Sequence, residues 1–272
     1  MSSPAPDRRP WWPRLPEKAA DWELTSNFIS RPLAAWLLYP VRATASPNLV
    51  TVASLFAGLA GAGLLAMHAL SPSAGVVGAA LGLLFLAMIL DDGDGQLARF
   101  QGRSSRFGSF LDKSVDVVRF GLLFPLLSWL AGSQTGDWIH GMAGPLAAFG
   151  LMIQGYSKWL AVAMQPLSVA PQPLAFAAQP QAAQPQASQP LASQPQAAQP
   201  QAGHPWVSGM LVALLWPFHE CDLTVWVVVL GAFGQWVPLV WILAASQLLA
   251  GFAALFARLW QVRADERRTP AA

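Results

Sequence analysis

The sequence predicts an all-α polytopic membrane protein, with six transmembrane helices and an N-terminal helix that lies in the membrane interface. Of its 272 residues, 54% are hydrophobic and 11% are charged, and the mean hydropathy is +0.40. This composition is too apolar for an ordinary soluble domain. Two further observations support the prediction: long apolar segments alternate with short polar turns, and Lys and Arg gather on one side of the resulting path.

The predicted spans are the long apolar segments of the chain. They comprise residues 49–68, 74–100, 108–130, 138–164, 223–233 and 236–259. Ser46 and Pro47 suit the N-cap and the first turn of the first span. The apolar residues 206–218 are fewer than the ~20 that cross ~30 Å of hydrocarbon. We therefore predict that this segment is interfacial or re-entrant.

Five regions follow one another in this prediction: a cytoplasmic N-terminal region, spans one to four, a low-complexity loop of Pro, Gln and Ala, an interfacial segment with spans five and six, and a cytoplasmic tail. Their bounds are 1–45, 46–164, 165–205, 206–262 and 263–272. The interfacial helix is expected at residues 19–38, where charged and apolar residues mix. The regular prolines of the loop are incompatible with a continuous helix.

The basic residues set the predicted orientation. With the N-terminal region in the cytoplasm, six alternating spans bring all 16 Lys and Arg residues onto or near that side. The turns on the opposite side contain none of them, in agreement with the positive-inside rule. Because these cations lie at the ends of apolar spans and form no stripe, membrane topology explains them, and nucleic acid is not an expected partner.

Five of the 14 acidic residues lie within residues 90–116, between two apolar segments. A carboxylate at the centre of a membrane helix costs about 2.5–3.5 kcal/mol to insert, so an acidic cluster there indicates function. Asp91 and Asp94 share one helix face, and Asp112 and Asp116 share another. Since a short connection makes the two helices antiparallel neighbours, we expect the two pairs to converge at one depth.

Four carboxylates in one place require cations. Mg²⁺ and Mn²⁺ prefer carboxylate oxygen and bridge to substrate phosphates. Two such ions ~3.5–4 Å apart stabilise both the attacking and the leaving oxygen of an in-line phosphoryl displacement. The small residues Gly95, Ala98 and Gly108 leave room for a phosphate or nucleotide beside the backbone, and Arg99 supplies a cation for it.

These residues form a motif with fixed spacing. It reads Asp91-x2-Asp94-Gly95-x2-Ala98-Arg99-x8-Gly108-x3-Asp112-x3-Asp116. At every fixed position it is similar to the motif of the CDP-alcohol phosphotransferase (phosphatidyltransferase) family, whose six-span topology also agrees with the topology predicted above. The resemblance covers about residues 46–158. Pro47, Asn48 and Thr51 resemble an opening that is common in this family.

The resemblance implies an enzyme that transfers a substituted phosphate group from a CDP-alcohol, such as CDP-diacylglycerol, to an acceptor alcohol and releases CMP. The implied ligands of two Mg²⁺ or Mn²⁺ ions are Asp91, Asp94, Asp112 and Asp116. Asp116 would also be the general base on the acceptor hydroxyl. The implied lining of the CDP pocket is Asp91, Gly95, Ala98, Arg99 and Gly108. A homodimer is expected on the same ground. We expect the protein in a bacterial inner membrane, and the orientation set by the basic residues places its site on the cytoplasmic side.

The sequence identifies the residues that would contact the acceptor less clearly than those that would contact the donor. Lys158 follows Tyr156 in an element that resembles one contacting acceptor phosphate in some members, but Leu160 stands where a second basic residue is usual. His219 precedes the fifth predicted span on the same side and is a second candidate acceptor contact. The sequence therefore leaves the acceptor alcohol open, and also whether the donor is lipid-linked or a CDP-polyol.

Several residues have alternative interpretations. Asp92 occupies a variable position of the motif, so we expect it to cap a helix or face solvent. Lys113 and Arg119 are expected to snorkel or to pair with carboxylates. Structural ion pairing would explain the motif aspartates differently, and its candidate cations are Arg99, Arg103 and Arg106. For the whole chain, the rival function is a non-catalytic divalent-cation carrier or sensor that uses the same carboxylates.

Overall fold

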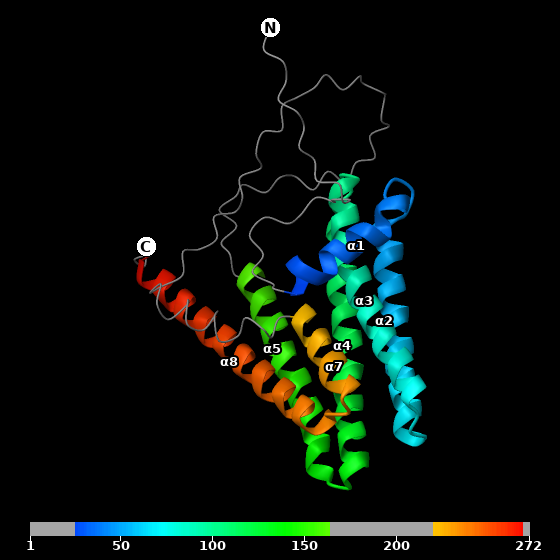
Figure 1. Cartoon of the computed structure of the whole chain (residues 1–272). Coiled ribbons are helices and arrows are strands. Elements are labelled where there is room, and N and C mark those ends of the chain that lie inside the picture. Colours follow the sequence, from blue (N-terminus) through cyan, green and yellow to red (C-terminus); the bar gives the residue numbers. More distant parts are fainter. Residues whose placement is uncertain (1–24, 164–219, 269–272) are drawn as a thin grey trace.

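The computed structural model describes residues 25–163 and 220–268, and these ranges contain helices and turns but no strand. For them, the all-α prediction is confirmed. The elements, in which η marks a short turn of tighter or wider helix, are η1 Ser26–Ser30, α1 Arg31–Leu38, η2 Tyr39–Val41, α2 Pro47–Leu70, α3 Ala74–Phe100, α4 Arg106–Thr135, η3 Trp138–Met142, α5 Ala143–Ala163, α7 Glu220–Ala232 and α8 Trp236–Arg268. In Figure 1, α2, α3 and α4 stand together as long rods, and α8 runs obliquely away from them.

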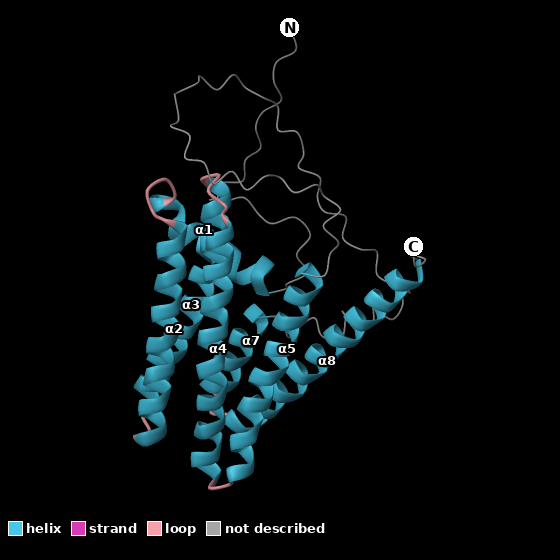
Figure 2. Cartoon of the chain, turned by 180° about the vertical axis from the view of Figure 1, so that it is seen from behind, coloured by secondary structure: helices cyan, strands magenta, loops and turns pink. Residues whose placement is uncertain are grey.

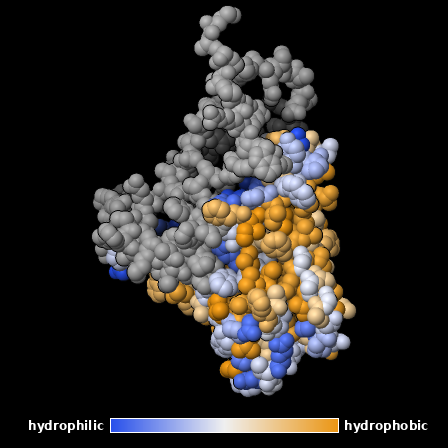
Figure 3. Space-filling model, in the orientation of Figure 1, coloured by the Kyte–Doolittle hydropathy of each residue, from blue (hydrophilic) through white to orange (hydrophobic). Residues whose placement is uncertain are grey.

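Within the described residues, four helices are long and apolar enough to cross a membrane: α2, α3, α4 and the part of α8 from Trp236 to Ala264. They correspond to the first, second, third and sixth predicted spans. The fourth and fifth predicted spans correspond to α5 and α7. Helix α7 has 13 described residues and rises about 20 Å, which is less than the ~30 Å of hydrocarbon. Figure 3 shows apolar side chains over much of the exposed flank of the bundle, as contact with lipid requires.

Local sequence signals mark the starts of α2 and α4. Helix α2 begins at Pro47 after an extended Ser46, as predicted, although the Ser46 side chain makes no capping hydrogen bond. At the start of α4, the Ser105 side chain accepts a 3.0 Å hydrogen bond from the backbone N–H of Gly108. Short connections at 71–73 and 101–105 make α3 antiparallel to both α2 and α4. The first turns of α2 and α4 therefore lie at the same end of the bundle as the last turns of α3, seen from both sides in Figures 1 and 2.

The core lies between α2, α3, α4, α5, α7 and α8. Phe120, Phe124 and Leu127 of α4 are at most 1% exposed and belong to one cluster with side chains of the other five helices. Trp236, at the start of α8, packs on Gly231 of α7, where a Cβ would come within 2.8 Å of the indole ring. Because lipid is as apolar as this core, close packing rather than burial from water stabilises the helix contacts.

Small residues bring α5 close to α8 and α4. A Cβ on Gly150 would collide with the backbone of Gln247, and one on Gly144 would collide with the carbonyl group of Phe124. Beside this contact, the Gln154 amide donates a 2.9 Å hydrogen bond to Oε1 of Gln247. Glycine at a helix crossing and a hydrogen bond between helices are both typical of membrane bundles.

The N-terminal helix, η1 with α1, packs across α3 at the end of the bundle where α3 ends and α4 begins (Figure 1). Its buried face includes Ala34 and Leu38. Gly93 of α3 lies under both, and a Cβ there would be 3.2 Å from that of Ala34. On the other face, Phe28 and Trp36 are 76% and 69% exposed. That this helix lies in the membrane interface stays a prediction.

Candidate metal and phosphate site

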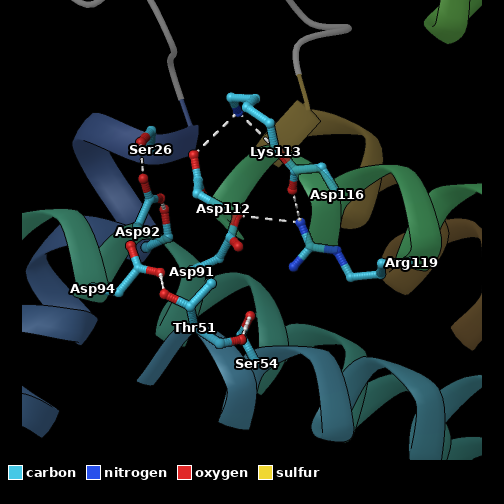
Figure 4. Close-up of polar contacts among 11 residues, drawn as sticks. Ser26, Thr51, Ser54, Asp91, Asp92, Asp94, Asp112, Lys113, Asp116 and Arg119 are labelled. Atoms are coloured by element: carbon cyan, nitrogen blue, oxygen red, sulfur yellow. Dashed lines mark hydrogen bonds and ion pairs between the residues drawn. The ribbon is translucent and has the colours of Figure 1, made fainter. Parts of the chain in front are cut away.

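Three helices build one polar site at the end of the bundle that carries α1. The last turns of α3 contribute Asp91 and Asp94, and the first turns of α4 contribute Asp112 and Asp116. Thr51 reaches the same place from the first turns of α2. Figure 4 shows these side chains pointing towards one another. The convergence expected from the spacing of the aspartates is therefore present for Asp91, Asp94 and Asp112.

Three of the four motif aspartates form a group suited to a metal ion. Asp91, Asp94 and Asp112 each offer a carboxylate oxygen, and these oxygens lie within 4.8 Å of one another. An octahedral Mg²⁺ ion, at 2.0–2.1 Å from its ligands, holds their oxygens roughly 3–4 Å apart, so a small closure would complete the site. Oδ1 of Asp91 is buried and has no hydrogen-bond partner, which leaves an acceptor available for a cation. The residues thus fit a divalent ion.

The hydroxyl group of Thr51 orients this triad, because it donates a short hydrogen bond to Oδ2 of Asp94. Thr51 and Asp94 are both buried, at 3% and 6% exposure. A residue that hydrogen-bonds to a carboxylate ligand fixes the rotamer of that ligand and so helps to form the metal site. In the pattern formed by Pro47, Asn48 and Thr51, the threonine therefore serves to orient a proposed metal ligand, Asp94.

Asp116 is separate from the triad and is held by two cations. Its Oδ2 accepts a 2.8 Å hydrogen bond from Nζ of Lys113, and its Oδ1 accepts one of 2.9 Å from Arg119. Arg119 also donates to Asp91 at 3.2 Å, and Lys113 lies 3.4 Å from Asp112. The expectation that Lys113 and Arg119 pair with carboxylates is confirmed. Within the described part of the chain, Lys113 and Arg119 are thus cations that form ion pairs with the motif aspartates.

The four small or basic motif residues predicted to accommodate the donor line one pocket. These are Gly95, Ala98, Arg99 and Gly108. Asp94 and Asp112 line it too, so the pocket opens directly onto the acidic triad. A Cβ on Gly95 would lie 3.2 Å from the Arg99 guanidinium, so the arginine head group packs close to the glycine backbone. Its remaining lining is Pro47, Asn48, Thr51, Arg103, Ser104, Ser105 and Ser109.

Asp92 does not face solvent, and that part of the expectation was wrong. Its side chain is only 11% exposed and lies 3.8 Å from the guanidinium of Arg31. It accepts hydrogen bonds from the hydroxyl groups of Ser26, at 2.7 Å, and of Ser30, as Figure 4 shows in part. One helical turn further, the Gln96 amide donates to the Arg31 carbonyl at 3.2 Å. Asp92 thus fastens the N-terminal helix to α3.

The two candidate acceptor contacts lie outside the described side chains. Lys158 is part of α5, but its side chain is not described, and His219 precedes the first described residue of α7. Nearby, Asp222 of α7 is 4% exposed, and its Oδ1 accepts a 3.1 Å hydrogen bond from the backbone N–H of Thr25. This residue joins α7 to the N-terminal helix.

The part of the chain that carries this site is similar to known proteins. Residues 44–171 match the family model described as CDP-alcohol phosphatidyltransferase. The archaetidylinositol phosphate synthase of Aeropyrum pernix is 37% identical over 121 residues. That alignment covers 44% of this chain and 58% of the archaeal protein, so the chain matches little more than half of the relative's length.

Proposed function

Residues 44–171 are a domain of the CDP-alcohol phosphatidyltransferase family, and from this premise we propose that the protein is a membrane transferase of phospholipid biosynthesis. It transfers a phosphatidyl or similar substituted phosphate group from a CDP-alcohol to an acceptor alcohol and releases CMP. The observation that carries the proposal is the shared position of Asp94 and Asp112, which belong both to the acidic triad and to the wall of the adjoining pocket.

The triad is the proposed metal site, with Mg²⁺ or Mn²⁺ as the ion. Such an ion, when bound, neutralises charge on the donor phosphates and on the leaving CMP. Asp91, Asp94 and Asp112 hold the ion, while Thr51 keeps Asp94 in position. Arg99, in the wall of the pocket, is placed to offer its guanidinium to a phosphate.

Asp116 is the proposed general base for the acceptor hydroxyl. Lys113 and Arg119 engage one oxygen each, so the carboxylate has a single defined orientation. It lies one helical turn from Asp112, beside the triad. A general base acts only within hydrogen-bond distance of the proton that it removes. We therefore expect that Asp116 contributes to catalysis through its fixed position beside the acceptor hydroxyl.

The archaeal relative guides the choice of substrates. Its name states that it produces archaetidylinositol phosphate. We propose, by similarity, a lipid-linked CDP donor and an inositol phosphate as the first acceptor to test. The pocket supports an anionic substrate, because its wall includes Arg99 and Arg103 together with Ser104, Ser105 and Ser109.

We extend the proposal to topology. Helices α5 and α7 serve as the fourth and fifth of six spans, and the site faces the cytoplasm. Basic residues support this orientation, since Arg42, Arg99, Arg103, Arg106 and Lys113 all lie in the end of the bundle that holds the site. A homodimer in the cell membrane completes the proposal.

The test is CMP release by the purified chain in detergent or vesicles. CDP-diacylglycerol is supplied with inositol phosphate, glycerol phosphate or free inositol, in the presence of Mg²⁺ or Mn²⁺ or of a chelator. CMP formation that requires both an acceptor and the metal supports the proposal, and mass spectrometry of the product identifies the acceptor. Uptake of Mn²⁺ into vesicles without CMP from any donor would instead favour a cation carrier.

A further inference from the structure

Arg119 is a buried cation inside the acidic site, although the motif has no fixed residue at this position. It follows Asp116 by one helical turn on α4 and is 6% exposed. One guanidinium nitrogen donates to Asp116 on the same helix, at 2.9 Å, and to Asp91 on α3, at 3.2 Å. Figure 4 shows this nitrogen between carboxylates from the two helices.

The surrounding helices form a slot for this side chain. The aliphatic stem of Arg119 passes over Gly58 of α2, where a Cβ would come within 3.0 Å of the arginine Cδ. Its guanidinium carbon lies 4.9 Å from the centre of the Phe120 ring. Burying an arginine in a membrane bundle is costly unless its charge is compensated, and here the compensating groups are two carboxylates of the proposed active site.

The charges of the motif aspartates and of their paired cations determine how many divalent ions the site can neutralise. In the described ion pairs, two side-chain cations, Lys113 and Arg119, contact three of the four motif carboxylates, those of Asp91, Asp112 and Asp116, and Asp94 is the fourth. Among these side chains, two negative charges are left over, and one divalent ion neutralises them. A second ion would bring the group to a net positive charge before any phosphate enters.

The position of Arg119 opposes a second ion more directly. An ion bound by Asp91 and Asp116 would have to lie between these two carboxylates, where the guanidinium now makes both contacts. Two cations cannot occupy this space without strong repulsion in a site shielded from water. Among the described side chains, one group brings three carboxylate oxygens within 4.8 Å of one another, and its members are Asp91, Asp94 and Asp112.

We propose that the guanidinium of Arg119 stands in for one of the two divalent ions, so that the chain without its donor binds a single ion, at Asp91, Asp94 and Asp112. This inference rests on the proposed function, because it assumes that the triad is a metal site. It revises the expectation of two ions and gives Arg119 a positioning role, in which it holds Asp91 and Asp116 at the separation that an ion would otherwise set.

Counting bound Mn²⁺ tests the proposal without any turnover. The full-length chain is purified in detergent, stripped with a chelator and titrated by calorimetry, and the ions are then examined by electron paramagnetic resonance. We expect one tightly bound Mn²⁺ per chain, with the spectrum of an isolated ion. Arg119→Gln is expected to bind two, and their coupling should alter the spectrum, since ions in two-metal sites lie ~3.5–4 Å apart.

Three further variants make the count specific. Arg263→Gln changes an exposed arginine on α8 and should bind one ion, as the unaltered chain does. Arg119→Lys keeps the charge and should also bind one. Asp116→Asn, added to Arg119→Gln, removes a ligand of the new site and should return the count from two to one.

A count of two in the unaltered chain without nucleotide would overturn the proposal, and so would a count of one in folded Arg119→Gln. If Arg119→Gln cannot be purified, the unaltered chain and Arg119→Lys decide alone, since a count of two in either contradicts the inference. The proposed function is judged separately by CMP release. Two ions together with CMP release would refute only the role of Arg119, whereas one ion without CMP would refute only the transferase.

Discussion

Replacing Asp92 by alanine is expected to release the N-terminal helix from α3 while leaving the rest of the bundle folded. The Asp92 carboxylate accepts hydrogen bonds from Ser26 and Ser30 and lies 3.8 Å from the guanidinium of Arg31. All three partners belong to the first described turns of the chain and are at most 6% exposed. Alanine at this position removes every one of these contacts in a single step.

The expected loss is about 3 kcal/mol. A hydrogen bond to a charged group contributes about 1.5–3 kcal/mol, and two are lost. We take the lower figure for each, because a freed serine hydroxyl can form another hydrogen bond, as that of Ser30 can with a carbonyl one helical turn earlier. The ion pair to Arg31, at 3.8 Å, adds less than about 1 kcal/mol. A change of 3 kcal/mol increases the population of the released helix roughly 100-fold.

Hydrogen exchange measured by mass spectrometry reports this release directly. Peptides from residues 26–38 should exchange roughly 100-fold faster in Asp92→Ala, whereas peptides from α2 and α4 keep their protection. Asp137→Ala is the matched control, because Asp137 is an exposed carboxylate that accepts a hydrogen bond at the opposite end of the bundle. Unchanged protection of residues 26–38 would refute the reasoning, and so would an equal loss of protection throughout the protein.

Three other changes test the site and the packing. Asp116→Asn should lower CMP release by about 10²–10⁴-fold, the usual contribution of a general base, with Asp137→Asn unchanged; turnover near the unaltered level would exclude Asp116 as the base. Thr51→Val should raise the Mg²⁺ concentration needed for half-maximal activity by about 10–100-fold, whereas Thr51→Ser retains the hydroxyl group and should stay close to the unaltered chain. Gly150→Ala should lower the thermal midpoint through a clash worth about 1–3 kcal/mol, while Gly155→Ala, with open space around it, should not; equal midpoints would contradict the close crossing of α5 and α8.

Much of the site followed from helical spacing together with one short connection between helices. Residues three or four apart on a helix share a face, so the positions of Asp91, Asp94 and Asp112 were enough to place three carboxylates together. The short connection between the two helices supplied the remaining constraint, that they run antiparallel. Gly95 and Gly108 were also interpretable in advance, because a pocket beside the backbone needs residues without side chains.

The partners of the aspartates could not be predicted in the same way. Lys113 and Arg119 were each open to two interpretations, since a long cationic side chain near a helix end either snorkels towards water or turns inward. What decides in favour of pairing for Arg119 is Gly58, which lies on another helix and leaves space for the arginine stem. The contact between Gly150 and Gln247 was missed for the same reason, because it joins helices separated by a long stretch of sequence.

Helix α3 presents its acidic residues in two directions, and this separates the two functions assigned to them. Successive residues turn by about 100°, so Asp91 and Asp94 lie about 60° apart and Asp92 and Gln96 about 40° apart, while the two pairs differ by about 150°. The first pair faces the proposed ion, and the second holds the N-terminal helix. Asp92→Ala should therefore keep the Mn²⁺ count of the unaltered chain while loosening that helix, and Arg119→Gln should change the count while the helix stays protected.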